Sequence, residues 1–131
     1  YGVSPTPPTL YRSTNNGDSW VMTDSALTGR RIWDMIANSS GKILAITEGG
    51  AFMWNGTEWN ATSGPPHGAD ELVLDSAGTL YAGGFSGLSI SSDFGNSWRF
   101  ADNLQRTYVL SVTANPSGEV FAATNNLPWR L

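Results

Sequence analysis

Five acidic residues have side chains that could carry out acid–base chemistry. They are Asp24, Asp34, Glu48, Asp70 and Glu71. Glycoside hydrolysis uses a pair of such carboxyl groups, one on each side of the scissile bond. The sequence supplies the residue types but not the distance between them, so it assigns no catalytic residue.

Arginine, aromatic and histidine side chains in the irregular loops of the sequence have the chemistry of a binding site. The candidate binding residues are Arg30, Arg31, Trp33, His67, Arg106 and Tyr108. A guanidinium group can hold a carboxylate through paired hydrogen bonds, and an aromatic ring can pack against a sugar ring. The alternative interpretation is that these are solvated loop residues or residues that pack between structural repeats.

The composition argues against several other kinds of chemistry. The 131 residues include no cysteine and one histidine, so we expect no disulfide, no cysteine nucleophile and no zinc site. The glycine-rich stretch at 80–87 lacks the lysine and the following helix of a phosphate-binding loop. We therefore expect neither a metal nor a cofactor.

Charge and hydropathy also limit the expected partners. The net charge is −4 and no run of Lys or Arg occurs, so nucleic acid is not an expected partner. No apolar stretch approaches the roughly 18 residues that cross a bilayer, so we expect no membrane insertion. With 40% hydrophobic and 14% charged residues, the chain has the composition of a folded domain.

The sequence contains a repeat of 39 residues. Trp20, Trp59 and Trp98 are evenly spaced and end the segments "STNNGDSW" (13–20), "FMWNGTEW" (52–59) and "SSDFGNSW" (91–98). A second unit recurs between them as "ANSSGKILAIT" (37–47), "LDSAGTLYAGG" (74–84) and "ANPSGEVFAAT" (114–124). Because both units recur in the same order, the chain is an array of similar structural units.

Each period predicts four short strands. In the best-preserved repeat these are 71–74, 80–83, 87–91 and 98–101, separated by turn residues. No segment has helical periodicity of sufficient length. Four antiparallel strands in about 40 residues are typical of a β-propeller blade. We predict an all-β fold of about three four-stranded blades plus partial strands.

One of the eight-residue segments resembles a known repeat motif. "SSDFGNSW" matches the Asp-box of the bacterial neuraminidase repeat, Ser-x-Asp-x-Gly-x-x-Trp. The residues at the motif positions of the three repeats, with Asn15 in place of the aspartate in the first, are Ser13, Asn15, Gly17, Trp20, Gly56, Trp59, Ser91, Asp93, Gly95 and Trp98. The resemblance implies a hairpin between the third and fourth strands of a propeller blade.

A structural role for this motif follows from its chemistry. We expect Asp93 to close the turn by accepting backbone hydrogen bonds, Gly95 to adopt a positive φ, and Trp98 to pack against the adjacent blade. Asn15 can close the first turn in the same way. Trp54 replaces the aspartate in the second copy, whose turn must depend on Asn55 and Gly56.

The resemblance implies a protein of the extracellular space or cell surface. We expect a non-catalytic scaffold or binding module that binds carbohydrate or protein, or that assembles through its blade edges. The alternative is a fragment of a propeller glycosidase, sialidase-like or xyloglucanase-like, with catalytic residues partly outside this chain. Asn38, Asn55 and Asn60 each begin a glycosylation sequon.

The number of repeats is too small for a closed ring. The blade repeats lie at approximately 1–23, 31–61, 69–101 and, in part, 107–131. Propellers have about 4–8 blades, so we do not expect this chain to close as a monomer. "YGV" (1–3) resembles a second strand and "PWRL" (128–131) a third strand. We expect a homo-oligomer or the remainder of a longer propeller chain, and the absence of an initiator methionine favours a fragment or processed product.

Overall fold

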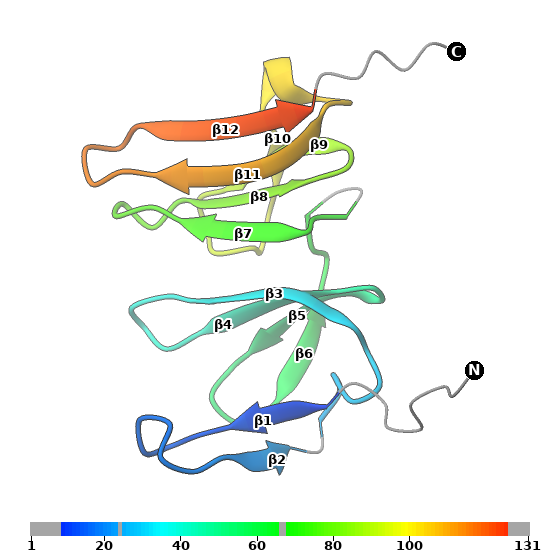
Figure 1. Ribbon diagram of the computed structural model, residues 1–131, viewed down its shortest axis with the longest axis vertical. Coiled ribbons are helices and arrows are strands. Elements are labelled where there is room, and N and C mark those ends of the chain that lie inside the picture. The colour runs from blue at the N-terminus through cyan, green and yellow to red at the C-terminus, as the bar shows by residue number, and fades with distance from the viewer. Residues whose placement is uncertain (1–8, 24, 66–67, 126–131) are drawn as a thin grey trace.

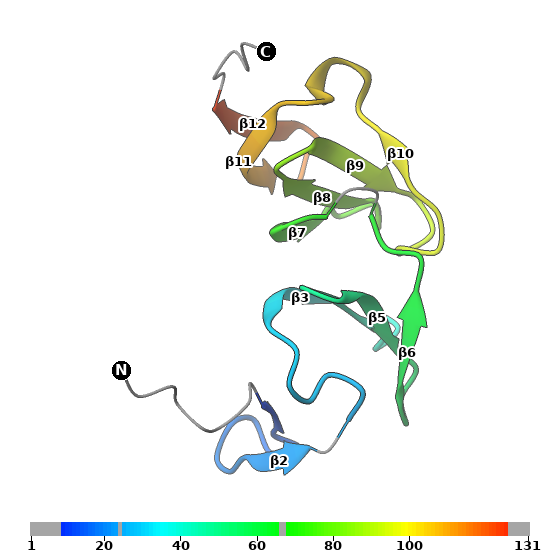
Figure 2. The same cartoon turned by 90° about the vertical axis from the view of Figure 1, so that its right-hand side faces the viewer.

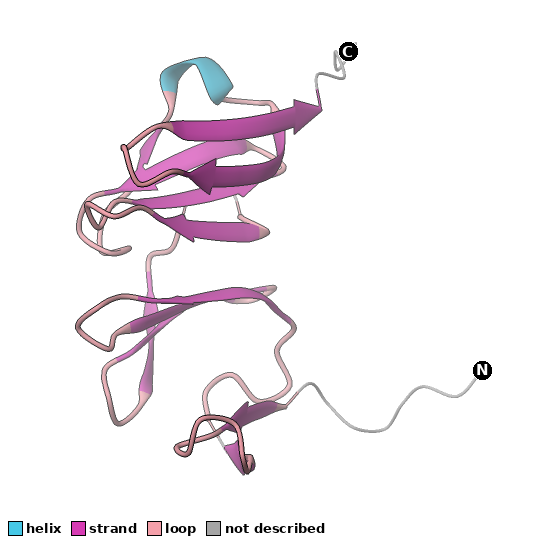
Figure 3. Cartoon of the chain, turned by 60° about the vertical axis from the view of Figure 1, so that its left-hand side comes forward, coloured by secondary structure: helices cyan, strands magenta, loops and turns pink. Residues whose placement is uncertain are grey.

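β-strands dominate the regular secondary structure. The computed structural model describes residues 9–23, 25–65 and 68–125. Within these ranges it has twelve β-strands and a single three-residue 3-10 helix, η1 (Asp102–Leu104) (Figures 1 and 3). The all-β prediction is confirmed.

Two of the sheets are complete four-stranded blades. Blade I consists of β3 (Ile32–Ala37), β4 (Ile43–Thr47), β5 (Gly50–Trp54) and β6 (Trp59–Thr62), paired antiparallel in that order. Blade II consists of β7 (Glu71–Leu74), β8 (Leu80–Gly84), β9 (Gly87–Ser91) and β10 (Arg99–Phe100). All four strands predicted for blade II agree with the structure to within one residue at each end. The fourth, predicted at 98–101, is one residue shorter at each end, and Ala101 already precedes η1.

The other two sheets are half-blades. The N-terminal half-blade pairs β1 (Leu10–Arg12) with β2 (Val21–Thr23), the positions of the third and fourth strands of a blade. The C-terminal half-blade pairs β11 (Tyr108–Ala114) with β12 (Val120–Asn125), the positions of the first and second strands. The resemblances of 1–3 and 128–131 to further strands lie outside the described residues.

The four sheets follow one another along an open arc (Figure 2). The first strands β3, β7 and β11 lie along its inner side, where β3 contacts β7 and β7 contacts β11. The arc does not close on itself, as the sequence predicted. The structure is therefore an unclosed, propeller-like array of antiparallel blades.

The hydrophobic core lies between the blades. In β4, Leu44 and Ile46 pack in the cluster between blades I and II, whereas Ala45 packs in the cluster between the N-terminal half-blade and blade I. Successive side chains of a strand point to opposite faces of the sheet. The continuous apolar run in β4 is thus explained by burial on both faces.

The turns between first and second strands share one hydrogen-bonding pattern. Asn38, Asp75 and Asn115 each accept backbone N–H groups two and four residues ahead through the side-chain Oδ1. In this Asx geometry the side-chain oxygen accepts the backbone N–H groups of the turn and so stabilises it. It fixes where each first strand ends and thereby sets the register of the repeat.

Two absences among the described residues concern possible partners. No helix there is long and apolar enough to cross a bilayer. No group of three or more His, Asp or Glu side chains gathers there as ligands for a metal ion.

Candidate functional site

The hairpin between β9 and β10 is closed by side chains. The Ser91 hydroxyl donates to Asp93 Oδ1 (2.8 Å) and accepts the Gly95 N–H (2.8 Å). Asp93 accepts the Ser97 N–H (2.8 Å) and the Ser97 hydroxyl (2.5 Å). The bonds from the Ser97 side chain and backbone, and then from Ser91, lower the pKa of Asp93 to about 2. Gly95 adopts φ +86°, a value that favours glycine.

The hairpin between β1 and β2 has the same geometry with an amide in place of the carboxylate. The Ser13 hydroxyl donates to Asn15 Oδ1 (2.9 Å) and accepts the Gly17 N–H (2.9 Å). Asn15 Oδ1 accepts the Ser19 N–H (3.0 Å), and its amide donates to the Ser19 hydroxyl (2.8 Å). A negative charge is therefore not required for this turn.

The hairpin between β5 and β6 is shorter. Asn55 Oδ1 accepts the N–H groups of Thr57 (2.9 Å) and Glu58 (3.0 Å), while Gly56 adopts φ +106°. This is the use of Asn55 and Gly56 that the sequence indicated. Two of the three copies thus share one hydrogen-bonding geometry, with an aspartate in one and an asparagine in the other, and the third closes a shorter turn through Asn55.

The three tryptophans that end these hairpins differ in burial. Trp98 is half-buried against the cluster that includes Leu44 of blade I. Trp59 is half-buried against the cluster that includes Leu10 of β1. Trp20 is 62% exposed, because the described chain has no blade before the N-terminal half-blade. The inter-blade contact expected from the motif thus exists only where a preceding blade is present.

The candidate residues Arg30, Arg31 and Trp33 lie together at the start of β3. The guanidinium carbon of Arg31 is 4.4 Å from the Trp33 ring centroid, and that of Arg30 is 5.0 Å from the Phe52 ring centroid. Glu48 lies beside them, since its N–H donates to the Arg31 carbonyl (3.0 Å) and its Oε1 accepts the Arg31 N–H (3.4 Å). The arginines here already lie on aromatic faces.

Trp33 is exposed because of a β-bulge. The pairing of β3 with β4 shifts between Ile32 and Asp34, which leaves Trp33 out of the ladder with 43% of its surface exposed. β11 has the same shift between Val109 and Ser111, with Leu110 54% exposed. Such bulges redirect a side chain. Here they expose one large side chain at the same position of two inner strands.

The candidate residues Arg106 and Tyr108 belong to a second group, before β11. The Tyr108 hydroxyl donates to Asp70 Oδ2 (3.3 Å), and the negative charge of Asp70 raises the Tyr108 pKa. The Tyr108 ring lies 6.0 Å from the ring of Phe85, which is 60% exposed. Arg106 is exposed, with its N–H bonded to the Ser86 carbonyl (3.0 Å). His67 and Asp24 lie outside the described residues.

The sequence did not predict the contacts of Phe85 and Asp70. Phe85 stands in the glycine-rich stretch at 80–87, which lacks the features of a phosphate-binding loop, and it was not among the candidate binding residues. Gly87 in that loop adopts φ +127°, and a Cβ there would overlap the Leu104 carbonyl. The glycines therefore serve close packing of two loops. The signal available in the sequence was an aromatic residue within an otherwise glycine-rich loop.

Two of the acidic candidates join neighbouring blades. Asp34 Oδ2 accepts the Leu72 N–H (2.7 Å) and Oδ1 accepts the Met35 N–H (2.7 Å). Glu71 Oε2 accepts the Val112 N–H (2.9 Å). Each carboxylate thus connects the first strand of its own sheet to the first strand of the next. A backbone-bonded carboxylate is poorly placed to act on a substrate.

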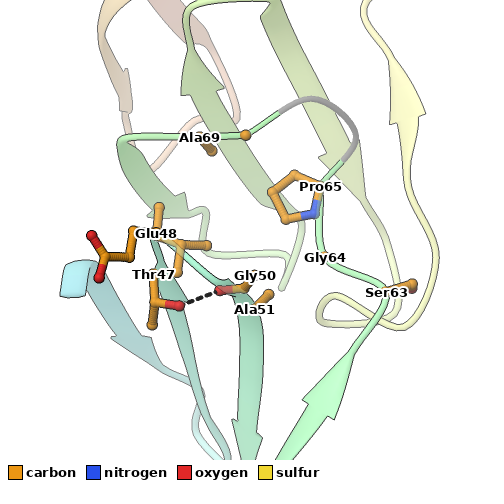
Figure 4. Close-up of a pocket in the computed structure, with 10 residues that line it drawn as sticks. Thr47, Glu48, Gly50, Ala51, Ser63, Gly64, Pro65 and Ala69 are labelled. Carbon is orange, nitrogen blue, oxygen red and sulfur yellow. Dashed lines mark hydrogen bonds between the residues drawn. The ribbon is translucent and has the colours of Figure 1, made fainter. Parts of the chain in front are cut away.

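A pocket of about 250 Å³ lies at this end of the blades, between the β4–β5 turn and the segment after β6 (Figure 4). Its walls include Thr47, Gly50, Ser63, Gly64 and Pro65. Thr47 is engaged with the turn itself, since its hydroxyl donates to the Gly50 carbonyl (2.8 Å). The pocket offers mainly backbone and small side chains rather than a set of convergent acids.

Comparison of the chain with family models, with curated proteins and with solved structures finds no match. Their geometry alone therefore indicates what these groups can do.

Proposed function

We propose that this chain is part of an Asp-box β-propeller that acts as a non-catalytic binding module, with its ligand site at the end of the blades that carries Trp33 and Phe85. The family assignment is supported by the repeated turn, in which serine and an Asp or Asn side chain bond the same backbone positions. The proposed location of such a module is outside the cell.

The observation that carries the binding function is the exposure of aromatic faces beside polar groups. Trp33 is 43% exposed with Arg31 on its ring, and Phe85 is 60% exposed beside Tyr108 and Asp70. Aromatic faces flanked by hydrogen-bonding groups suit sugar rings. Carbohydrate is therefore the ligand class that we favour, ahead of protein.

The catalytic alternative finds less support in the acidic residues. Asp34 and Glu71 accept backbone hydrogen bonds, Asp70 accepts the Tyr108 hydroxyl, and Glu48 lies against the Arg31 backbone. Glycoside hydrolysis needs one carboxyl group as acid and a second as base or nucleophile, both facing the substrate. Each described acidic candidate instead has a partner within the fold.

A glycan array followed by hydrolysis assays tests this function. The wild-type chain should retain a defined set of glycans without releasing product from sialosides or β-glucans, and Trp33→Ala should lower retention at least tenfold. Lys42→Ala, at the exposed turn between β3 and β4, is the control and should bind as the wild type does. Absence of glycan binding, or hydrolysis that disappears in Asp70→Asn, would overturn the proposal.

A further inference from the structure

The two half-blades at the ends of the arc are complementary. The N-terminal half-blade has the third and fourth strands of a blade, and the C-terminal half-blade has the first and second. They lie at opposite ends of the molecule, so they do not pair within one chain (Figure 1). Each carries the strands that the other lacks.

The uncovered face of the N-terminal half-blade has the form of an inter-blade contact. Trp20 occupies the position of Trp98 in the repeat. Each tryptophan lies against the glycine three residues before it, Gly17 or Gly95, because a Cβ on that glycine would contact the indole ring. Trp98 packs on the blade before it, whereas Trp20 is 62% exposed. Tyr11, on the facing strand, is 55% exposed. This face is therefore built to pack against a blade.

The C-terminal half-blade exposes the opposite face. Exposure alternates along β12, with Ala122 half-buried against blade II and Phe121 60% exposed. Phe121 and Leu44 of β4 are equivalent, because each follows the Asx residue of its turn by the same number of residues. Leu44 is 0% exposed because blade II covers it. Phe121 thus lacks the covering blade that Leu44 has.

An apolar pocket of about 240 Å³ lies where a second strand would complete the N-terminal half-blade. Its apolar lining comes from Leu10, Met35, Ile43, Trp54 and Trp59. The edge of β1 beside it has no strand partner among the described residues. The pocket is therefore a gap in the repeat pattern.

The corresponding space between blades I and II is filled. The equivalents there of Met35, Ile43 and Trp59 are Leu72, Leu80 and Trp98. Leu44 and Ile46 of the second strand pack among them and are 0% and 3% exposed. In β12 the residues at these two positions are Phe121 and Ala123, both exposed. The repeat thus identifies β12 as a strand that fits the pocket.

We propose that β12 of one copy pairs with β1 of a second copy, so that the two half-blades form one composite blade. Phe121 of one copy then enters the pocket beside Trp59 of the other. Trp20 of the second copy packs against blade II of the first. This partner goes beyond the proposed binding function and does not depend on it.

The register of this pairing follows from blade II. There Leu80 lies opposite Ser91 and Ala82 opposite Ser89. Transferring the pattern to the equivalent residues places Ala122 of one copy opposite Tyr11 of the other. Both side chains then lie on the face that packs against the preceding blade.

A dimer is the assembly that closes. The described residues of each copy supply two complete blades and two half-blades, which together make three blades. Two copies give six blades, within the range of about 4–8 for closed propellers, whereas one copy gives three and three copies give nine. The two-fold arrangement is also the commonest symmetry of homo-oligomers.

The sequence of residues 1–3 resembles a second strand, so residues 1–8 are the alternative to β12 that the test must separate. β11 and β12 of a second copy supply both the first and the second strand that the N-terminal half-blade lacks. Removing residues 1–8 should therefore leave the dimer intact. Conversion of the truncated chain to a monomer would contradict the pairing of β12 with β1.

Solution mass is the first test. The wild-type chain should sediment as a dimer, at twice the 14.0 kDa of one chain. Phe121→Asp should give a folded monomer, because Phe121 is already 60% exposed within one copy. The control is Phe85→Asp, which changes an equally exposed phenylalanine at the proposed ligand site and should remain dimeric. A wild-type monomer at micromolar concentration would overturn the proposal.

Disulfide trapping tests the register in a chain that has no natural cysteine. Tyr11→Cys combined with Ala122→Cys should form a covalent dimer on mild oxidation, since directly opposed residues have suitable Cβ separations. Tyr11→Cys with Ala123→Cys places the second thiol on the other face and should cross-link at least tenfold more slowly. Equal rates for the two pairs would reject the register. Loss of glycan binding without loss of mass would reject only the ligand site.

Discussion

Replacing Asp34 by asparagine should weaken the fold more than replacing Glu71 by glutamine. Both changes remove one negative charge from equivalent inner strands. The two oxygens of Asp34 each accept a backbone N–H, from Met35 and from Leu72, both at 2.7 Å. An asparagine has only one oxygen, so one of these N–H groups must lose its acceptor.

The magnitude follows from that lost acceptor. Leaving a buried donor unsatisfied costs about 1–3 kcal/mol, and Leu72 is buried at 6% exposure. We expect Asp34→Asn to lower the free energy of unfolding by about 2 kcal/mol. At about 4 °C per kcal/mol for a chain of this length, the Tm should fall by about 8 °C.

The matched change, Glu71→Gln, keeps both hydrogen bonds of the Glu71 side chain. Its Oε2 accepts the Val112 N–H at 2.9 Å, and Oε1 lies 3.4 Å from the Ser111 hydroxyl. A glutamine oxygen can accept the same N–H while its amide donates to the hydroxyl. We expect Glu71→Gln to cost less than about 0.5 kcal/mol, or about 2 °C in Tm.

Thermal unfolding followed by circular dichroism at pH 7 and one protein concentration measures both variants. The fixed concentration removes any contribution from association. Equal losses in the two variants would show that charge, not the number of backbone acceptors, explains the effect. An unchanged Tm for Asp34→Asn would refute the link between blades I and II.

Two further predictions concern the hairpin turns. The pKa of Asp93 is about 2 in the folded chain and about 3.9 when unfolded, so its contribution to stability is complete above about pH 4 and is lost as pH falls toward about 2. The difference in Tm between wild type and Asp93→Asn, which mimics Asn15, should therefore be smallest near pH 2. A constant difference from pH 5 to pH 2 would contradict this. Gly95→Ala should lower the free energy of unfolding, measured by chemical denaturation, by about 1 kcal/mol more than Gly78→Ala does. Both glycines have nearly the same positive φ, but only at Gly95 would a Cβ lie 3.1 Å from Leu44. Equal losses would argue against close packing at Gly95.

Local signals explain how much of the fold the sequence predicted. Asp75 and Gly78 mark the turn between β7 and β8, and "SSDFGNSW" marks the turn before β10, so strands between these signals were placed to within one residue. Turn chemistry depends on residues two to four positions apart, which a sequence shows directly. The bulge at Trp33 depends on pairing across two strands and was not predicted.

Contacts between blades are harder to predict for the same reason. Asp34 and Glu71 bond residues 38 and 41 positions away, so neither bond leaves a local pattern. A periodic signal was nevertheless present, because both acids stand four residues before the Asx residue of the following turn, Asn38 or Asp75. Comparison of repeats could have separated these acids from catalytic candidates. The group of Phe85, Tyr108 and Asp70 comes from irregular loops and has no such signal.

The proposed dimer and the proposed ligand site are coupled through geometry. The two-fold axis of the dimer coincides with the central axis of the ring. The two copies of the site containing Trp33 therefore lie at the same end of the assembly. Two linked sites bind a dense surface more tightly than one site does, without any new contact. Phe121→Asp should therefore bind an immobilised glycan at least tenfold more weakly than wild type, yet bind the same glycan free in solution equally well. Equal loss in both formats would mean that Phe121 supports the site itself, and the two proposals would then not be independent.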